Sequence, residues 1–386
     1  MAHAILSPSG ADKWLNCPPS ARFEEQIPEE TSIYAEEGTL AHSLAALLLE
    51  RKLGGNGDDE HLTYLEEDIL SFYLGLGGCD PELELKAMHG YVKEYVDFVL
   101  ELGGTILIER QYDLGQFVPL AFGTSDASNL VGTTLYITDL KYGSGKRVTA
   151  KANNQLRLYA LGAYLELSKR HTIENVIMTI YQPRAGGISS DEITVLELLD
   201  WAENVVKPKA LLAIAGQGDF KAGKHCQFCK AKSSCMAHFQ LFEKLNDIRL
   251  SNLMSDEDLV FVLEYGSIIS SWIKKVTDDT VIKMQGGKEI SGFKLVEGRG
   301  KRVFTDEADV IDSLIGAGIP DESIFTTELR NLTDLEKLLG KKKFPLILGD
   351  YVCTQKARPQ IVPDSDARPS ISENAADIYD EEDLTE

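Results

Sequence analysis

The sequence predicts an α/β protein in which helices flank a mixed central sheet. Long segments with apolar residues at helical spacing occupy much of the first hundred residues and recur after residue 150. Between them lies a run of short β-type segments separated by turn residues, which is typical of an antiparallel meander. The resulting order of helix, helix, meander, helix, strand and helix is found in α/β and α+β proteins, where helices pack on a sheet.

Length and composition limit the class of protein. At 386 residues, the chain is long enough for two domains or for one large domain with appendages. Its 43% hydrophobic and 26% charged residues are ordinary for a globular protein and exclude a wholly disordered chain. No apolar run approaches the roughly 20 residues that span a membrane, and the first seven residues lack the pattern of a secretory signal. We therefore expect a cytoplasmic protein without a membrane span.

The N-terminal hundred residues are expected to be mainly helical. Ser7 is placed to cap the first helix, and Gly103 with Gly104 ends the last one of this region. The expected elements are a short helix at 11–15, a helix at 36–53, a Gly-rich acidic surface insertion at 54–82 and a helix at 83–102.

The middle of the chain supplies the sheet. Turn signals such as Gly115 and Gly132 separate the β-type segments, and Pro183 ends the last of them. The expected strands are 105–112, 118–122, 127–131, 133–140 and 176–182. A helix at 150–169 connects the last two strands, and a helix at 193–215 is expected to kink or restart at Pro208.

The C-terminal third is expected to form separate units. We place a first domain at 1–240, a helical connector at 241–288, a small α+β domain at 289–363 and a disordered acidic tail at 364–386. The expected elements there are a helix at 253–284, strands at 293–296 and 302–305, and helices at 308–315 and 334–339. The tail holds nine acidic residues against one arginine, a composition that cannot build a core.

The charge balance is strongly acidic. The chain has 39 basic and 61 acidic residues and a net charge of −22. This excludes a uniformly basic surface for non-specific nucleic-acid binding but leaves room for a local basic groove. The most basic stretch holds Lys141, Lys146, Arg147, Lys151 and Arg157. It is either such a groove for a polyanion or a solvated loop with some lysines.

The first chemical motif combines two aspartates with a lysine. Asp126 follows a turn at Gly123, and Asp139 and Lys141 stand at the end of a later strand. Alternate residues of a strand share a face, so Asp139 and Lys141 lie side by side. With Asp126 from a hairpin partner, two carboxylates can bind Mg²⁺ or Mn²⁺ while the lysine stabilises charge. The alternative interpretation is a surface hairpin with an ordinary ion pair.

Two weaker features accompany this motif. Gln155 and Tyr159 are four residues apart and share a face of the helix that follows the strand. His42 stands near the start of an amphipathic helix and could complete a metal shell. Taken singly, each is more typical of structural packing, as a polar residue beside a core tyrosine or as a structural histidine.

A cysteine cluster is the strongest local signal. Cys226, Cys229 and Cys235 fall within ten residues of a chain that we expect to be cytoplasmic, which indicates a metal site rather than a disulfide framework. Three cysteines need a fourth ligand, and the candidates are Cys17, His225 and His238. A site with a histidine fits zinc, whereas four thiolates suit either zinc or a [4Fe–4S] cluster.

In order and spacing, these motifs resemble the PD-(D/E)XK nuclease superfamily. The likeness is to its RecB-like branch with a four-cysteine cluster, as in the AddB nuclease domain and the CRISPR-adaptation nucleases. It covers about residues 5–240, and Ser125 stands where the superfamily's name has proline. The matching residues are, in chain order, Cys17, His42, Gly123 to Asp126, Asp139 to Lys141, Gln155, Tyr159, Cys226, Cys229 and Cys235. The whole chain is also similar to a phage- and prophage-encoded family of this branch.

The resemblance implies a fold and a role for each matched residue. The fold would be a restriction-endonuclease-like core with a mixed sheet flanked by helices. His42, Asp126 and Asp139 would hold Mg²⁺ or Mn²⁺, with the Leu140 carbonyl as a further ligand. Lys141 would assist the attacking water. Gln155 and Tyr159 would orient Lys141 or the DNA backbone. From the basic stretch, and not from the resemblance, the four predicted DNA contacts are Lys146, Arg147, Lys151 and Arg157.

The implied activity is that of a metal-dependent DNA nuclease. It would be an exonuclease of phage recombination or DNA processing that hydrolyses phosphodiesters with metal-activated water, in the bacterial host cytoplasm. Cys17, Cys226, Cys229 and Cys235 would hold a [4Fe–4S] cluster, or zinc in the alternative, and tie the two ends of the nuclease domain together. Besides DNA, the expected partner is a phage single-strand annealing or replication protein. The competing hypothesis is a non-catalytic nuclease-fold protein that binds DNA or acts as a scaffold through partners.

Overall fold

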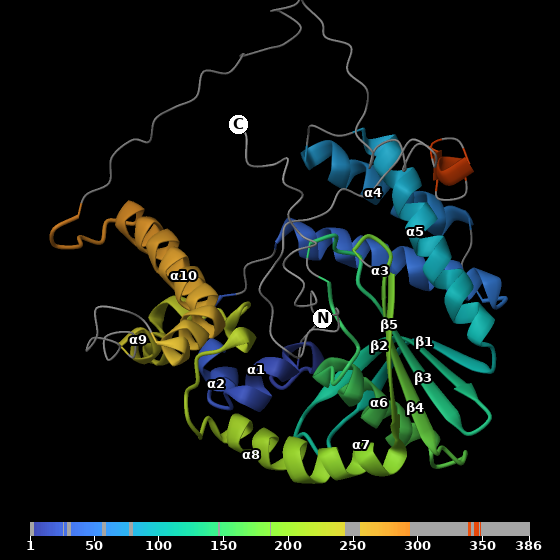
Figure 1. Ribbon diagram of the computed structural model, residues 1–386. Helices are drawn as coiled ribbons and strands as arrows, with labels where there is room; N and C mark the ends of the chain where they lie inside the picture. The colour runs from blue at the N-terminus through green and yellow to red at the C-terminus, as the bar shows by residue number, and fades with distance from the viewer. Residues whose placement is uncertain are drawn as a thin grey trace, which may run out of the picture. The chain divides into compact units, whose positions relative to one another are not determined.

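The computed structural model describes most of the chain up to residue 293 (Figure 1). The described residues are 4–25, 27–28, 32–55, 59–76, 80–145, 147–185, 187–243, 255–293, 339–340, 343–346 and 348. The chain divides into two units, Met1–Glu328 and Leu329–Glu386, and the fold below is that of the first. For the small C-terminal domain, the predicted strands lie outside the described residues apart from Phe293, and the predicted helix at 308–315 lies outside them entirely. The acidic tail at 364–386 also lies outside them.

A five-stranded mixed sheet forms the centre of the first unit. Its strands are β1 (Thr105–Asp113), β2 (Phe122–Val131), β3 (Thr134–Leu140), β4 (Asn175–Gln182) and β5 (Gly187–Thr194), and they adjoin in that order. The β1–β2, β2–β3 and β4–β5 pairs are antiparallel, and β3–β4 is parallel. A parallel pair needs a crossover, which helix α6 (Asn154–Leu167) supplies. The predicted α/β class with helices around a mixed sheet is confirmed.

Strand β2 corrects the sequence prediction of two short strands. The strand is continuous through Gly123, where a turn was expected. A Cβ atom at Gly123 would lie 2.5 Å from Pro8 Cγ and 3.0 Å from Tyr159 Cε1, so this glycine makes room for two packed neighbours. Strand β5 was not predicted, because its mostly polar residues alternate between exposed and half-buried positions and give little apolar signal.

Three helices cover one face of the sheet: α3 (Ile33–Lys52), α4 (Asp59–Leu76) and α5 (Pro81–Leu102). They share a hydrophobic core with Ala127, Leu140 and Tyr181 of the sheet. The surface insertion predicted at 54–82 is therefore wrong for most of its length. Helix α4 buries Ile69 and Tyr73 against its neighbours, and its acidic residues occupy the faces away from that core. Of the glycines that suggested an insertion, Gly54 and Gly55 follow α3 and Gly75 lies within α4.

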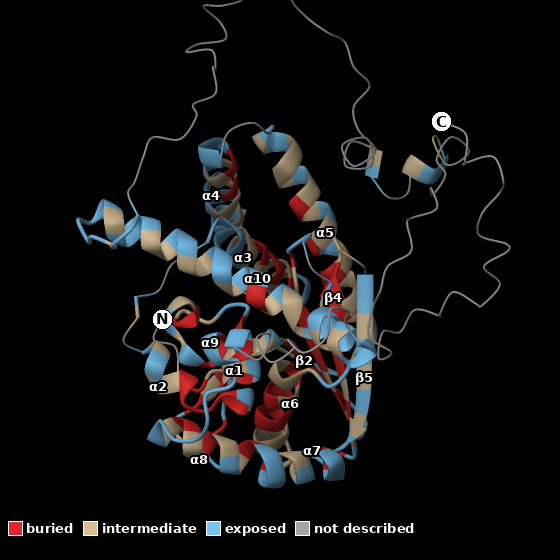
Figure 2. Ribbon diagram, turned by 60° about the vertical axis from the view of Figure 1, so that its left-hand side comes forward, coloured by how far each residue is buried: buried red, intermediate tan, exposed pale blue. Residues whose placement is uncertain are grey.

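The other face carries α6 and a long, interrupted helix. That helix consists of α7 (Val195–Trp201), a π-helical turn (Ala202–Val206) and α8 (Lys207–Ala215). Pro208 lies in the first turn of α8, where a missing backbone N–H costs nothing, so the predicted restart is confirmed. Figure 2 shows the buried residues concentrated on α6 and on the central strands.

The two ends of the described fold meet beside α8. The N-terminal arm consists of η1 (Pro8–Gly10), α1 (Ala11–Asn16) and α2 (Ser20–Glu24). The C-terminal segments are η3 (Lys224–Cys226), η4 (Lys232–Ser234), α9 (Met236–Glu243) and α10 (Asp256–Gln285). Arg22 Nε donates to the Ile214 carbonyl at 2.8 Å, and the Trp14 indole donates to the Ser7 carbonyl at 3.1 Å. The first bond fixes the arm against the end of α8, and the second fixes the arm internally.

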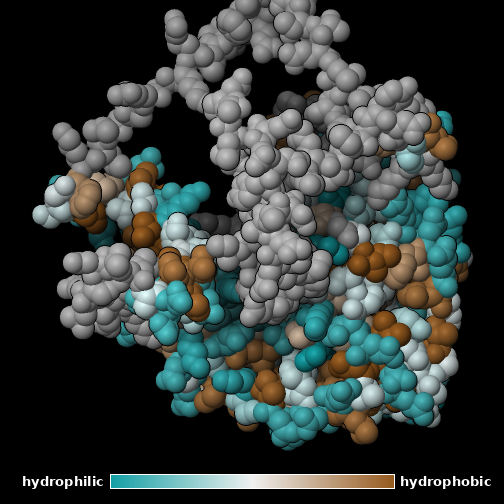
Figure 3. Space-filling view, in the orientation of Figure 1, coloured by the Kyte–Doolittle hydropathy of each residue, from teal (hydrophilic) through white to brown (hydrophobic). Residues whose placement is uncertain are grey.

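Helix α10 begins at Asp256, inside the helix predicted at 253–284. Ser255 and Asp258 form a capping box, in which each side chain binds the other residue's backbone N–H. Several apolar side chains of α10 are exposed, and Figure 3 shows hydrophobic patches over this helix. Within the described residues, no helix combines the length and the apolar character that crossing a membrane requires.

Candidate functional site

A histidine and two carboxylates from three elements converge where α3 meets the sheet. His42 Nδ1 of α3 lies 3.3 Å from Asp126 Oδ1 of β2. The ligand atoms of His42, Asp126 and Glu109 of β1 all lie within 4.8 Å of one another. Nitrogen and oxygen donors at this spacing can bind one divalent cation.

Asp126 is held in place by the neighbouring strand. The sequence suggested that Asp126 stands at the start of a strand, but it lies inside β2. The backbone N–H of Leu140 in β3 donates to Asp126 Oδ2 at 2.8 Å, so one carboxylate oxygen is fixed by the sheet and the other faces His42.

Asp139 and Lys141 form an ion pair at the end of β3. Lys141 Nζ lies 2.8 Å from Asp139 Oδ2, and Asp139 is almost completely buried. The ammonium also donates to Gln155 Oε1 at 3.3 Å, and Gln155 Nε2 donates to the Tyr159 hydroxyl at 3.0 Å. The lysine is thus restrained between a strand carboxylate and the first turns of α6.

Glu109 was not foreseen from the sequence. In the β1–β2 register, Ile108 pairs with Ala127 and Arg110 with Ser125, which places Glu109 opposite Asp126. Its φ of 43° is in the left-handed region, which is unusual for a residue that is not glycine. Strained backbone is found preferentially at functional sites. A prediction of the β1–β2 register would have indicated Glu109.

The electrostatics of the site favour positive charge. Burial alone would lower the pKa of His42, but the carboxylate of Asp126 raises it to about 9. The same contact holds the pKa of Asp126 below its ordinary value despite burial. Burial and the nearby Asp126 raise the pKa of Glu109 to about 7. Repulsion among carboxylates is relieved by a bound cation, so the residues present fit a divalent metal.

Lys141 remains charged in this environment. Burial lowers the pKa of its ammonium, but Asp139 and Asp126 outweigh burial and raise it above the ordinary value. Burial also raises the pKa of Asp139, with a further contribution from Asp126 that Lys141 opposes. The site therefore pairs a fixed ammonium with a cluster of carboxylates on adjacent strands.

A buried network positions the helix that carries His42. Glu37, which precedes His42 in α3, accepts hydrogen bonds from the Tyr73 hydroxyl at 2.8 Å and from Arg184 Nη1 at 2.7 Å. The Arg184 guanidinium lies 4.7 Å from the centre of the ring of Tyr142, the residue that follows Lys141 in sequence. These contacts join α3 to the end of β3 and to the turn after β4.

The predicted DNA contacts differ in exposure and in their partners. Lys146 lies outside the described residues. Arg147 and Lys151 are exposed in the segment between β3 and α6. The Arg157 guanidinium lies 3.8 Å from Asp191 and 5.6 Å from the centre of the Trp201 ring, away from the Gln155–Tyr159 face. A role for these residues in DNA binding stays a prediction.

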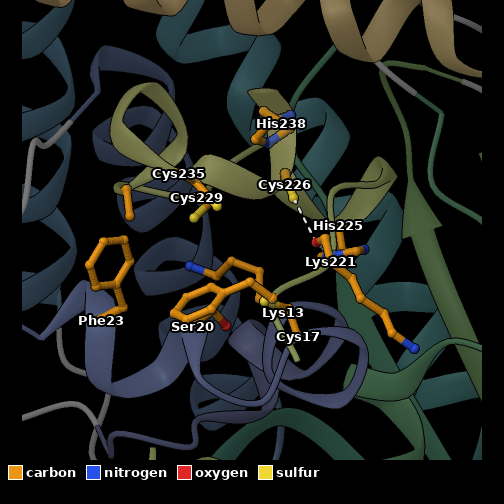
Figure 4. A pocket seen from close by; sticks show the side chains of 12 residues that line it. Lys13, Cys17, Ser20, Phe23, Lys221, His225, Cys226, Cys229, Cys235 and His238 are labelled. Carbon is orange, nitrogen blue, oxygen red and sulfur yellow. Dashed lines mark hydrogen bonds between the residues drawn. The ribbon is translucent and has the colours of Figure 1, made fainter. Parts of the chain in front are cut away.

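Four cysteines line one pocket at the junction of the chain ends (Figure 4). Cys17 follows α1, and Cys226, Cys229 and Cys235 come from the loop after α8. All four are free thiols in the structure. Burial raises the pKa of Cys17 and Cys226. Burial, followed by the charge of Glu24, raises the pKa of Cys229 to about 12. The fold thus brings Cys17 to the other three.

Contacts other than the cysteines also form this pocket. Glu24 of α2 accepts from Lys13 Nζ at 2.6 Å and from the backbone N–H of Lys230 at 2.6 Å. The rings of Phe23 and Phe220 meet edge to face with centroids 5.5 Å apart. The two segments are therefore held together by polar and aromatic contacts around the thiols.

Two observations test whether this pocket fits a metal. His238 lines it, is 1% exposed, and neither ring nitrogen has a hydrogen-bond partner among the described residues. Among the described residues, one group of three possible metal ligands has its ligand atoms within 4.8 Å of one another, and it consists of His42, Glu109 and Asp126. No three cysteine sulfurs of the pocket lie that close together in the described part of the chain. A tetrahedral zinc ion with Zn–S bonds of about 2.3 Å needs sulfurs about 3.8 Å apart. Thiols are ligands of both zinc and iron–sulfur clusters, so the residues present fit either group.

The candidate fourth ligands differ in their surroundings. His225 Nε2 donates to the Lys221 carbonyl at 2.8 Å, whereas His238 stacks on Trp272 with ring centroids 6.2 Å apart. Burial lowers the pKa of His238 to about 4, so this imidazole is neutral. Cys17 faces the same pocket as the three clustered cysteines.

Comparison with known proteins identifies a family and several solved structures with partial likeness, among them two crystal structures. The family described as "Protein of unknown function (DUF2800)" matches residues 3–369. The crystal structure of SSO0001 is 18% identical, with a TM-score of 0.26, over 58% of this chain and 95% of that one. That of a presumed exonuclease from Eubacterium rectale is 14% identical, with a TM-score of 0.33, over 66% of this chain and 92% of that one.

Proposed function

The chain belongs to the DUF2800 family, and we propose that it is a metal-dependent DNA nuclease that hydrolyses phosphodiester bonds. One observation carries the proposal: the Lys141–Asp139 ion pair lies on the strand next to the His42–Asp126 contact. A cation site and a fixed ammonium on adjacent strands can together bind a phosphodiester and stabilise the charge that develops on it.

His42, Glu109, Asp126 and Asp139 are the residues that would hold Mg²⁺ or Mn²⁺, with the Leu140 carbonyl as a further oxygen ligand. When bound, the ion supplies Lewis acidity at a phosphate oxygen and lowers the pKa of water. The fixed position of Asp126 supports this assignment, because the Leu140 N–H sets its orientation before any ion arrives.

Lys141 would donate from Nζ to a phosphate oxygen as negative charge develops there. Its contacts with Asp139 and Gln155 restrict the ammonium to one position, which lowers the cost of ordering it during the reaction. Gln155 in turn is held by the Tyr159 hydroxyl. Gln155 and Tyr159 are accordingly positioning residues that act through Lys141.

For the cysteine pocket, we propose a [4Fe–4S] cluster held by Cys17, Cys226, Cys229 and Cys235, with zinc as the alternative. Its role would be structural, since it would join the N-terminal arm to the loop after α8. The convergence of the four cysteines on one pocket, from segments more than 200 residues apart, supports this proposal. The resemblance in sequence supports an exonuclease of phage DNA recombination or processing.

A cleavage assay tests the nuclease proposal. Protein purified without oxygen is mixed with end-labelled linear DNA, single- and double-stranded, with Mg²⁺ and then Mn²⁺. We expect cleavage by the wild type and a loss of roughly 10²–10³-fold in Lys141→Ala and Asp139→Ala. Lys169→Ala is the matched control, because Lys169 is an exposed lysine just beyond α6. A wild type that cleaves no DNA with either metal would refute the proposal.

The acidic surface favours a second candidate function. A net charge of −22 opposes DNA binding outside a narrow channel and suits contact with a basic partner. In this alternative, the protein is a non-catalytic nuclease-fold scaffold. Pull-down of a partner by a wild type that lacks any cleavage activity would support it.

A further inference from the structure

Lys232 is a buried lysine directly after Ala231, which lines the cysteine pocket. It lies in η4, between Cys229 and Cys235 in sequence, and is 6% exposed. Its ammonium donates to the Ser271 hydroxyl of α10 at 2.6 Å. A hydroxyl is neutral, so this contact satisfies one hydrogen bond and leaves the charge uncompensated.

No carboxylate among the described residues forms an ion pair with Lys232. Asp279 of α10, which contacts the neighbouring Ser233, is already paired: it binds Lys275 at 2.8 Å and the Ser233 hydroxyl. Lys275 also repels Lys232. A buried ammonium without a counter-charge carries a large desolvation cost, and such charges are normally paired.

The groups facing Lys232 can change their charge. The ammonium interacts electrostatically with Cys226 and Cys229. On binding a metal these cysteines become thiolates. Four thiolates around zinc or a [4Fe–4S] core leave about two negative charges in excess.

We propose that Lys232 is the counter-cation of an anionic metal–thiolate centre in this pocket and that it retains the metal there. The inference rests on the proposed metal occupancy of the cysteine pocket. It explains why a lysine is buried where no carboxylate meets it. It also links the centre to α10, because the same ammonium binds Ser271.

The inference predicts opposite effects in the two states of the protein. In the loaded protein, Lys232→Met removes the counter-charge and should weaken metal retention. Outer-shell partners of metal ligands typically contribute about 10–100-fold in metal affinity. In the metal-free protein, the same change removes an uncompensated buried charge, so the melting temperature should stay the same or rise.

The test compares three variants purified without oxygen. Metal and acid-labile sulfide per chain are measured first, followed by the rate of metal release to a chelator and the melting temperature with and without metal. We expect release about 10–100-fold faster in Lys232→Met than in the wild type. Lys232→Arg keeps the charge and should restore slow release. Lys224→Met, an exposed lysine of the same loop, should match the wild type.

Two results would overturn the inference. One is a Lys232→Met protein that holds its metal as tightly as Lys224→Met does. The other is a wild-type protein that contains as little metal as the Cys17→Ser variant, which would refute the metal centre at the cysteines. The nuclease proposal would not be affected, because the cleavage assay tests it separately. If Lys232→Met does not fold, Lys232→Gln supplies the same loss of charge with a polar side chain.

Discussion

Replacing Gly123 by alanine tests the link between the N-terminal arm and the candidate site around Lys141. Gly123 lies in β2, where Pro8 of the arm and Tyr159 of α6 both touch the strand. The added Cβ would lie 2.5 Å from Pro8 Cγ and 3.0 Å from Tyr159 Cε1. Carbon atoms in contact are normally about 3.5–4.0 Å apart. Pro8 would therefore have to move by about 1 Å and Tyr159 by about 0.5 Å.

Overpacking of this kind costs about 1–3 kcal/mol. A domain of this size loses about 2–4 °C in melting temperature per kcal/mol, so Gly123→Ala should melt roughly 2–12 °C lower. A displaced Tyr159 would also disturb its bond to Gln155, the residue that positions Lys141. We therefore expect cleavage activity to fall along with stability.

Thermal unfolding of Gly123→Ala beside Gly90→Ala provides the measurement. Gly90 is exposed within α5, and a Cβ there meets no atom within 4 Å. Alanine in a helix interior is favoured over glycine by about 0.5–1 kcal/mol, so this control should be slightly more stable. If both variants melt at or above the wild-type temperature, the close packing argued for Gly123 is wrong.

Three more predictions follow from single contacts. Asn129→Ala removes two hydrogen bonds from its buried amide to carbonyls at the end of α5 (2.9 and 3.0 Å) and should cost about 2 kcal/mol in a urea titration; a change within 0.5 kcal/mol would contradict this. Glu37→Gln weakens the pairing of Arg184 and should cost about 1.5–3 kcal/mol, and the loss should disappear when Arg184 is also replaced by methionine. Mn²⁺ at a hundred times its dissociation constant should stabilise the wild type by about 2.7 kcal/mol and should leave Asp126→Asn unchanged; equal shifts would place the ion elsewhere.

Contacts set by local periodicity could be predicted from the sequence. Asp139 and Lys141 are two residues apart on a strand, and the structure has their ion pair at 2.8 Å. Gln155 and Tyr159 are four apart on a helix, and their side chains form a hydrogen bond at 3.0 Å. Both pairs lie within a single strand or helix, so their proximity can be predicted without knowing how the elements pack together.

Features that depend on how elements meet were missed. Glu109 faces Asp126 only through the β1–β2 register, which the apolar pattern of β1 does not reveal. Helix α4 was taken for an insertion because buried Ile69 and Tyr73 are few among many acidic residues. Arg157 was assigned to DNA from charge alone, whereas its neighbour Asp191 comes from a strand that the pattern did not show.

The central claim is that a divalent cation binds among His42, Asp126, Glu109 and Asp139. Anomalous X-ray diffraction from crystals soaked in Mn²⁺ tests it most directly, because the anomalous signal identifies the ion and its ligands together. We predict a peak about 2.0–2.4 Å from the His42 nitrogen and the carboxylate oxygens, absent in Asp126→Asn crystals. A soaked wild-type crystal whose manganese lies away from these side chains would contradict the account.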